Sequence, residues 1–255
     1  MSEAQLQQAL QLARGQLAPG GVLRAAINLG NTVLAQRGAD NGELSGELSG
    51  VSVDLARELA ARLGVEVQFV TFDAAGKVFE ALAGNAWDVA FLAIDPTRGE
   101  QIAFTPPYVL IEGAYMVREA SPLRRSEQVD RSGVRITVGA GSAYDLYLTR
   151  TLKEAQIERY ATAAEAFEVF VTQGFDAAAG VRQVVSRYAS THEGLRVLDD
   201  SFMTIRQAMG VPKGRADAAS ALAVFIEDMK ANGSVADSLA RSGQTAAAVA
   251  PPAAP

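Results

Sequence analysis

Short apolar runs alternate with amphipathic helical segments along the first part of the chain, and this alternation restricts the fold more than any other feature. Periodicity predicts strands at 22–29, 65–72 and 89–94, with helices at 53–63 and 75–83 between them. Strand–helix–strand order is typical of a parallel sheet that is covered by helices. An α/β fold with a mostly parallel sheet is therefore expected.

The same alternation begins again after Ser121 and Pro122, which end a strand predicted at 111–118. The second series comprises predicted strands at 134–139, 158–161, 175–180 and 195–198 and predicted helices at 142–155, 163–172 and 181–190. A further strand at 205–211 and helices at 217–231 and 235–240 follow. Repetition of one pattern within 255 residues predicts two similar lobes, each a mostly parallel sheet flanked by helices.

Both ends of the chain lie outside this alternation. Residues 1–21 contain leucines at helical spacing before a Pro-Gly-Gly break, so they are expected to form an appended helix. Residues 38–50 are polar and Gly-rich, which is typical of a hairpin-like loop. Residues 244–255 are rich in Ala and Pro and are expected to be disordered.

The composition excludes several functional classes. A net charge of −6 argues against a nucleic-acid partner and against a basic membrane-surface protein. The chain has no cysteine and one histidine, so neither a Cys/His metal site nor a histidine-based nucleophile is expected, and no cofactor is implied. No apolar run reaches ~18 residues, so membrane insertion is not expected. The N-terminus lacks an export-signal pattern, which indicates that such a signal has been removed or that the protein stays inside the cell.

Arg98 is the strongest candidate for a ligand contact. It follows the buried strand predicted at 89–94, and Asp95 and Pro96 mark the turn into a short helix. Ligands of open α/β sheets bind where strands end and helices begin, because backbone N–H groups converge there. The planar guanidinium of Arg98 would match a carboxylate. A solvated arginine in a first helical turn is the plainer alternative.

Other polar residues occupy similar positions. Asn28 and Asn31 follow the first strand, and Ser142 stands at the start of a predicted helix. Each has a simpler alternative, since asparagines close turns and serine caps helices. The Gly139-Ala140-Gly141 turn invites a dinucleotide reading, but the third glycine of that motif is missing, so a tight strand-to-helix turn is the better interpretation.

The order and spacing of several motifs resemble bacterial solute-binding protein family 3, the periplasmic amino-acid receptors of ABC importers. The similarity extends from residue 22 to residue 243. The segments that carry it are 50–60, 84–108, 139–143, 210–214 and 225–233.

The resemblance implies a periplasmic binding protein fold with two crossover segments near 109–113 and 204–209. Lobe 1 would then comprise 22–110 plus 207–243, and lobe 2 would comprise 111–206. A small ligand would lie in the cleft between the lobes, hinge closure would bury it, and a permease of an ABC importer would be the partner. The resemblance also implies a periplasmic location, with the cytoplasm as the alternative.

Residue by residue, the resemblance is mixed. Arg98 matches the arginine that clamps the ligand carboxylate, and Ser142 matches a donor to the same group. Hydroxyl-bearing positions of the family are Phe91, Ala93 and Asp95 here, so backbone N–H groups at Ala93 and Asp95 would have to serve. Gln207 falls in the second crossover and is a further candidate.

The acidic residue that would hold an α-ammonium group reads Val181, and Arg182 follows it. A buried ammonium without an anionic partner costs several kcal/mol. The sequence therefore predicts a carboxylate ligand without an α-ammonium, such as a keto, hydroxy or dicarboxylic acid, with Arg98 and either Arg182 or Lys77 as cationic contacts.

Two other functions stay open. Cyclohexadienyl dehydratases resemble this family, and Glu112, Glu119 and Lys77 are the groups that such an enzyme could use. A cytoplasmic ligand sensor is the second alternative.

Overall fold

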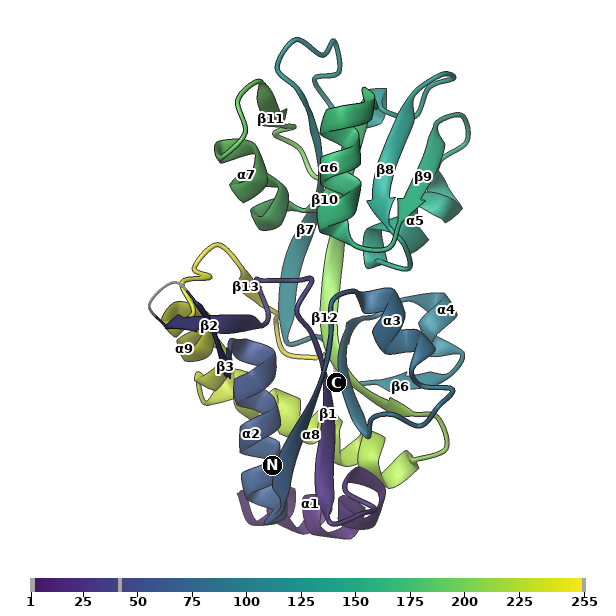
Figure 1. Ribbon diagram of the computed structural model, residues 1–255. Coiled ribbons are helices and arrows are strands. Elements are labelled where there is room, and N and C mark those ends of the chain that lie inside the picture. The colour runs from purple at the N-terminus through teal and green to yellow at the C-terminus, as the bar shows by residue number, and fades with distance from the viewer. Residues whose placement is uncertain (1–2, 41–42, 254–255) are drawn as a thin grey trace. The chain divides into compact units, whose positions relative to one another are not determined.

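The computed structural model describes residues 3–40 and 43–253, and the chain divides into two compact units (Figure 1). Unit 1 contains residues up to 72, residues 77–110 and residues from 206 onward, and unit 2 contains 73–76 and 111–205. Two long strands, β7 (Val109–Arg118) and β12 (Met203–Pro212), carry the chain from one unit into the other.

Unit 1 is built on a sheet in which strand β1 (Val22–Asn28) lies between β4 (Glu66–Phe72) and β5 (Val89–Ala93) and pairs with both in parallel. Strand β12 pairs with β5 and with β6 (Ile102–Phe104) in antiparallel orientation. All five residues of β5 are buried, which explains its unbroken apolar sequence.

Helices cover this sheet. They are α1 (Glu3–Leu17), α2 (Val51–Leu63), α8 (Ala216–Ala231) and α9 (Ser234–Arg241), with the short α3 (Ala75–Glu80) and α4 (Pro96–Gly99) after β4 and β5. The N-terminal helix α1, purple in Figure 1, packs against α8. It buries Leu6, Leu10 and Leu17. Where the sequence predicted a hairpin-like loop, the antiparallel strands β2 (Gln36–Asp40) and β3 (Glu43–Ser49) form a hairpin, and residues 41–42 lie outside the described part of the chain.

Unit 2 has the strand order β7, β10 (Ala177–Val181), β8 (Arg135–Gly139), β9 (Gln156–Tyr160), and β11 (Leu195–Val197) pairs with β7. Strands β8, β9 and β10 run parallel, and β7 is antiparallel to β10. Its helices are α5 (Ala143–Thr151), α6 (Ala163–Gln173) and α7 (Arg182–Ser190), and a 3₁₀ turn spans Ser126–Gln128. The core is built from the aromatic and aliphatic side chains of Met116, Phe167, Phe170, Phe175 and Val185. The predicted α/β class is thus confirmed.

Helix α5 is shorter than predicted. It ends at Thr151 rather than at residue 155, and Leu152 is extended. The carboxylate of Asp130 accepts the backbone N–H groups of Lys153, Glu154 and Ala155 at 2.8–3.1 Å. These bonds satisfy the N–H groups that would otherwise continue the helix, and they come from a residue outside the helical window.

The C-terminal tail was expected to be disordered, and this prediction is wrong for the described residues. Ala248 and Val249 form strand β13, which pairs with the first residues of β7. The N–H of Ala250 donates to the carbonyl of Tyr108 at 3.0 Å, and Ala250 is buried. Lys230 of α8 donates to the carbonyl of Pro251 at 2.9 Å. Tertiary pairing with β7 and α8 orders a segment whose composition alone favours disorder.

Candidate functional site

Arg98 lies at the end of the buried strand β5 in unit 1. Asp95 caps the one-turn helix α4 by accepting the N–H of Thr97 at 2.9 Å, and Pro96 begins the helix. The guanidinium of Arg98 is 1% exposed and its Nη1 donates to the carbonyl of Ala93 at 3.0 Å. Burial lowers the pKa of Arg98 to about 10, although the negative charge of Asp95 opposes the shift. The side chain therefore stays cationic at neutral pH inside an apolar unit.

Gln207 is brought to the same end of β5 by strand pairing. It is the register partner of Ala93, and the N–H of Ile94 donates to the carbonyl of Arg206 at 2.9 Å. The side chain of Gln207 is 5% exposed. Four sequence-predicted residues, Ala93, Asp95, Arg98 and Gln207, are thus neighbours within unit 1, although 109 positions separate Arg98 from Gln207 in the sequence (207 minus 98).

Asn28 is the last residue of β1 and Asn31 follows it shortly after. Since β1 is parallel to β5, both asparagines lie at the same edge of the unit 1 sheet. The Oδ1 atom of Asn28 accepts the N–H of Gly30 at 3.0 Å, and that of Asn31 accepts the N–H of Val33 at 3.3 Å. Both side chains close turns, as the plainer interpretation predicted. Their amide N–H₂ groups are the donors that a ligand would use, so the two roles are compatible. Lys77 is an exposed residue of α3.

Ser142 begins α5 in unit 2 and caps it. Its Oγ accepts the N–H of Asp145 at 3.1 Å, and the residue is 9% exposed. Gly141 has a φ of +65°, which glycine adopts without strain. The N–H of Gly141 donates to the Asp145 carboxylate at 2.8 Å. The turn from β8 into α5 is therefore held by a serine and an aspartate three residues apart.

Arg182 opens helix α7 in unit 2, and its charge is compensated there. Nε donates to the carboxylate of Glu112, and Nη1 donates to the carbonyl of Leu198 at 3.1 Å. The sequence nominated Arg182 as a ligand contact and Glu112 as a possible acid, but it gave no sign that the two form a pair. Val181, at the position where the resemblance requires an acid, is 7% exposed and makes no side-chain cap for α7.

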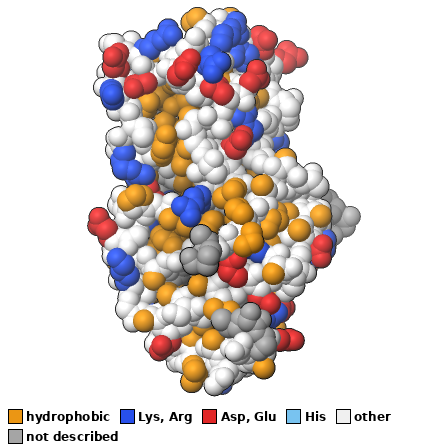
Figure 2. Space-filling model, turned by 180° about the vertical axis from the view of Figure 1, so that it is seen from behind, with side chains coloured by type: hydrophobic (Ala, Val, Ile, Leu, Met, Phe, Trp, Pro, Cys, Tyr) orange, Lys and Arg blue, Asp and Glu red, His pale blue; other side chains and the backbone are white. Residues whose placement is uncertain are grey.

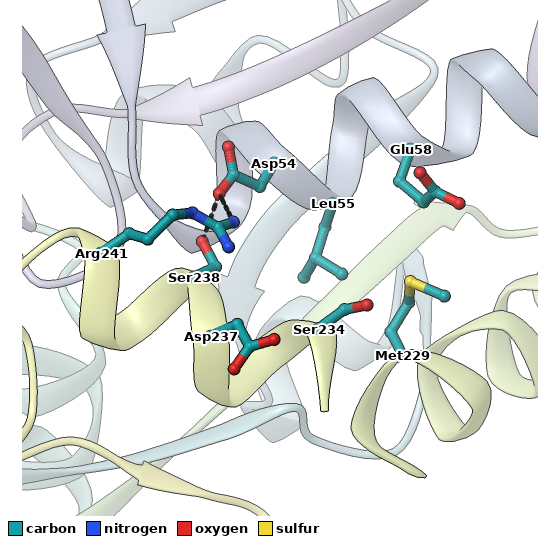
Figure 3. Close-up of a pocket in the computed structure, with 8 residues that line it drawn as sticks. All are labelled: Asp54, Leu55, Glu58, Met229, Ser234, Asp237, Ser238 and Arg241. Carbon is teal, nitrogen blue, oxygen red and sulfur yellow. Dashed lines mark hydrogen bonds and ion pairs between the residues drawn. The ribbon is translucent and has the colours of Figure 1, made fainter. Parts of the chain in front are cut away.

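A pocket in unit 1 lies apart from every predicted ligand residue. Figure 3 shows it between α2 and α9, with Met229 of α8 also in its lining. Its volume is about 160 Å³. Asp54 of α2 accepts hydrogen bonds from Ser238 and Arg241 of α9 across it. These bonds join two helices of the same unit, so helix packing explains why polar side chains line the pocket.

Surface charges are interspersed on the face shown in Figure 2, where basic side chains lie beside acidic ones. Within residues 3–40 and 43–253, no three His, Cys, Asp or Glu side chains converge as a metal site would require. In the same ranges, no helix combines the length and the hydropathy needed to cross a bilayer.

The sequence profile of the bacterial extracellular solute-binding proteins, family 3, matches residues 40–243. A mutant of ArgBP from T. maritima superposes with a TM-score of 0.75 at 20% identity, covering 91% of this chain and 99% of that one. An amino acid ABC transporter substrate-binding protein from Streptococcus pneumoniae, bound to L-arginine, gives a TM-score of 0.75 at 19% identity and covers 93% and 99%.

An ancestral amino-acid-binding protein, a precursor of cyclohexadienyl dehydratase, gives a TM-score of 0.72 at 23% identity and covers 89% of this chain and 97% of that one. At these identities the solved structures establish the fold. The family follows from the profile, which spans most of the chain.

Proposed function

We propose that this chain, which belongs to family 3 of the bacterial extracellular solute-binding proteins, captures a small carboxylate-bearing ligand and delivers it to an ABC importer outside the cytoplasmic membrane. The observation that carries this proposal is Arg98. A guanidinium that is 1% exposed and charged at neutral pH is costly to keep in an apolar unit, and its position at a strand end suits an anion.

The ligand class follows from the charges on the two units. Unit 1 offers the cation of Arg98 together with the amides of Asn28 and Asn31. Unit 2 offers the hydroxyl of Ser142 and has Val181 where an acid would hold an ammonium group. Glu112 is half-exposed, but it is already neutralised by Arg182. A carboxylate without an α-ammonium, such as a keto or hydroxy acid, fits this balance better than an ordinary amino acid does.

Isothermal titration with matched pairs tests this proposal. The pairs are L-arginine with 5-guanidino-2-oxopentanoate, L-glutamine with 2-oxoglutaramate, and L-glutamate with 2-oxoglutarate. We expect a keto acid to bind at least tenfold more tightly than its amino acid, and we expect Arg98→Lys to weaken it because lysine cannot offer a bidentate fork. Arg187→Gln, on an exposed arginine of α7, is the control. Tight binding of the amino acids alone would contradict the ligand class.

An enzyme of the dehydratase type is the second candidate, favoured by the structural likeness to the ancestral precursor. One of the two acids nominated for it, Glu112, is engaged with Arg182, which disfavours proton transfer from that carboxyl. Incubation with prephenate and with arogenate, followed by detection of the aromatic product, separates the two functions. Product formation that Arg98→Lys abolishes would favour the enzyme over the receptor.

A further inference from the structure

Asp145 and Arg159 form a side-chain cluster behind the turn that carries Ser142. The Asp145 carboxylate, on a residue 3% exposed, accepts the N–H of Gly141 at 2.8 Å and the Nε of Arg159 at 2.9 Å. Thr149 completes the cluster, because its Oγ1 accepts from Nη2 of Arg159 at 2.7 Å and donates to the carbonyl of Asp145 at 2.7 Å. Every member belongs to unit 2.

Two reciprocal hydrogen bonds between Asp145 and the Gly141–Ser142 turn hold the turn in place. The backbone N–H of Asp145 donates to Ser142 Oγ, while its side chain reaches back to the N–H of Gly141. This arrangement is related to a capping box, in which the first and fourth residues of a helix start satisfy each other. The turn is anchored on its other side as well, because the N–H of Ala140 donates to the carbonyl of Tyr160 at 2.8 Å.

The charge of the cluster bears on an anionic ligand. A carboxylate directly behind Gly141 and Ser142 would repel the carboxylate of a ligand on the other side of the same turn. Arg159 cancels that charge from strand β9, and it does so without reaching the turn itself, because its bonds go to Asp145 and Thr149. The turn thus obtains the rigidity of a charge-assisted hydrogen bond without a net negative charge.

We infer that Asp145 and Arg159 are positioning residues of the proposed site: Asp145 fixes the Gly141–Ser142 turn in the geometry that receives a ligand carboxylate, and Arg159 removes the repulsion that Asp145 would cause. This inference rests on the proposed function and assigns the pair a role in affinity. The repulsion that this role implies depends on the charge of Asp145 and on salt, which allows a direct test.

The first measurement needs no ligand. Amide hydrogen exchange of the wild type and Asp145→Asn is followed at residues 139–146, and we expect faster exchange at Gly141 in the variant because a neutral amide oxygen is a weaker acceptor. Asp130→Asn is the matched control, since Asp130 also binds backbone N–H groups next to α5, but at the other end of the helix. It should speed exchange at 153–155 and leave Gly141 unchanged.

The second measurement is isothermal titration with 2-oxoglutarate, 2-oxoglutaramate and 5-guanidino-2-oxopentanoate. Arg159→Gln should weaken binding about three- to tenfold, because the charge of Asp145 is then uncompensated and only partly screened by solvent. The double variant Asp145→Asn/Arg159→Gln should bind more tightly than Arg159→Gln alone, and raising NaCl to 1 M should shrink the defect of the single variant. Asp130→Asn should bind as the wild type does.

Two results would overturn the inference. One is a double variant that binds no better than Arg159→Gln, because repulsion from the Asp145 carboxylate would then not explain the weaker binding of the single variant. The other is unchanged exchange at Gly141 in Asp145→Asn. If the wild type binds none of the three keto acids but does bind L-arginine, L-glutamine or L-glutamate, the ligand class proposed above is wrong. The affinities of the same variants are then measured with that amino acid. If it binds none of the six compounds, the proposed function fails, and the role in affinity fails with it.

Discussion

Replacement of Asp88 should strongly destabilise unit 1. Its carboxylate is buried and accepts hydrogen bonds from Nε and Nη2 of Arg24, both at 2.9 Å, and from Nη1 of Arg215 at 3.2 Å. The backbone N–H of Arg24 also donates to it, at 3.2 Å. One carboxylate thus joins strand β1 to the segment before α8.

The size of the effect follows from these contacts. Removing one partner of a buried ion pair costs about 3–5 kcal/mol when the remaining charge cannot reach water. Here the side chains of Arg24 and Arg215 are 29% and 20% exposed, so both can rehydrate in part. We therefore expect Asp88→Asn to lower the free energy of unfolding of unit 1 by about 2–3 kcal/mol, below the fully buried limit.

The chain contains a single tryptophan, Trp87, which makes the assay specific to unit 1. Trp87 is buried and donates to the carbonyl of Val78 at 2.9 Å, so its fluorescence reports on the neighbourhood of Asp88. Urea unfolding followed by this signal should show a lower midpoint in Asp88→Asn with an unchanged slope. Glu66→Gln, on an exposed residue of β4 in unit 1, is the control and should change stability by less than about 0.5 kcal/mol. A loss below about 1 kcal/mol in Asp88→Asn would refute the reasoning.

The same carboxylate predicts a pH dependence. Burial alone would raise the pKa of Asp88, but the hydrogen bonds from Arg24 and Arg215 outweigh it and lower the pKa. A depressed pKa contributes stability that is present above the pKa of the unfolded chain, about 3.9, and is lost as the pH falls through the folded value. The difference in the free energy of unfolding between the wild type and Asp88→Asn should therefore have its full value at pH 6 and should shrink below about pH 4. A constant difference from pH 6 to pH 2 would contradict the assignment.

Three further predictions concern stability. In α1, Leu10→Ala should cost about 2–5 kcal/mol in urea unfolding, whereas Leu12→Ala, on a side chain 76% exposed, should cost less than about 0.5 kcal/mol; equal losses would mean that α1 does not pack as described. Gly50→Ala should cost about 1–3 kcal/mol in the same assay, because Gly50 has a φ of +110° and its new Cβ would meet a carbonyl oxygen at 2.5 Å; Gly20→Ala, with open space around it, should be neutral. Deletion of residues 244–255 should lower the calorimetric midpoint by about 5 °C through lost pairing with β7, and an unchanged midpoint would contradict an ordered tail.

Most strands and helices could be predicted from the local sequence pattern, because the periods of strands and helices depend only on neighbouring residues. The apolar run of β5 and the spacing of α2 are examples: burial on all sides needs an unbroken apolar strand, and burial on one face needs a 3.6-residue period. The errors arose where distant residues decide the outcome. Asp130 ends α5 from outside the helix, and β7 with α8 orders the Ala/Pro-rich tail.

The residues of the candidate site can likewise be separated into those with a local sequence signal and those without one. The positions of Arg98 at a strand end and of Ser142 at a helix start could be predicted, because strand ends and helix starts have local signals. The pair of Glu112 and Arg182, 70 positions apart, has none. Asp145 was missed although a signal exists, since Ser142 followed three residues later by an acid is close to the capping-box pattern. Its partner Arg159 lies on the neighbouring strand and becomes visible only through the parallel pairing of β8 and β9.

Under the proposed function, the charges in unit 2 would make a ligand's ammonium group compete with Arg182 for Glu112. An ordinary amino acid brings an ammonium group that needs an anion, and the carboxylate of Glu112 on β7 is bound by Arg182. To use it, the ammonium group would have to displace a guanidinium that also donates to the carbonyl of Leu198. That exchange replaces one charge-assisted hydrogen bond by another and leaves a cation without its partner, so it yields little net free energy. A keto acid needs no such exchange. Discrimination against the ammonium group would then come from the occupied state of Glu112 as much as from the apolar side chain of Val181.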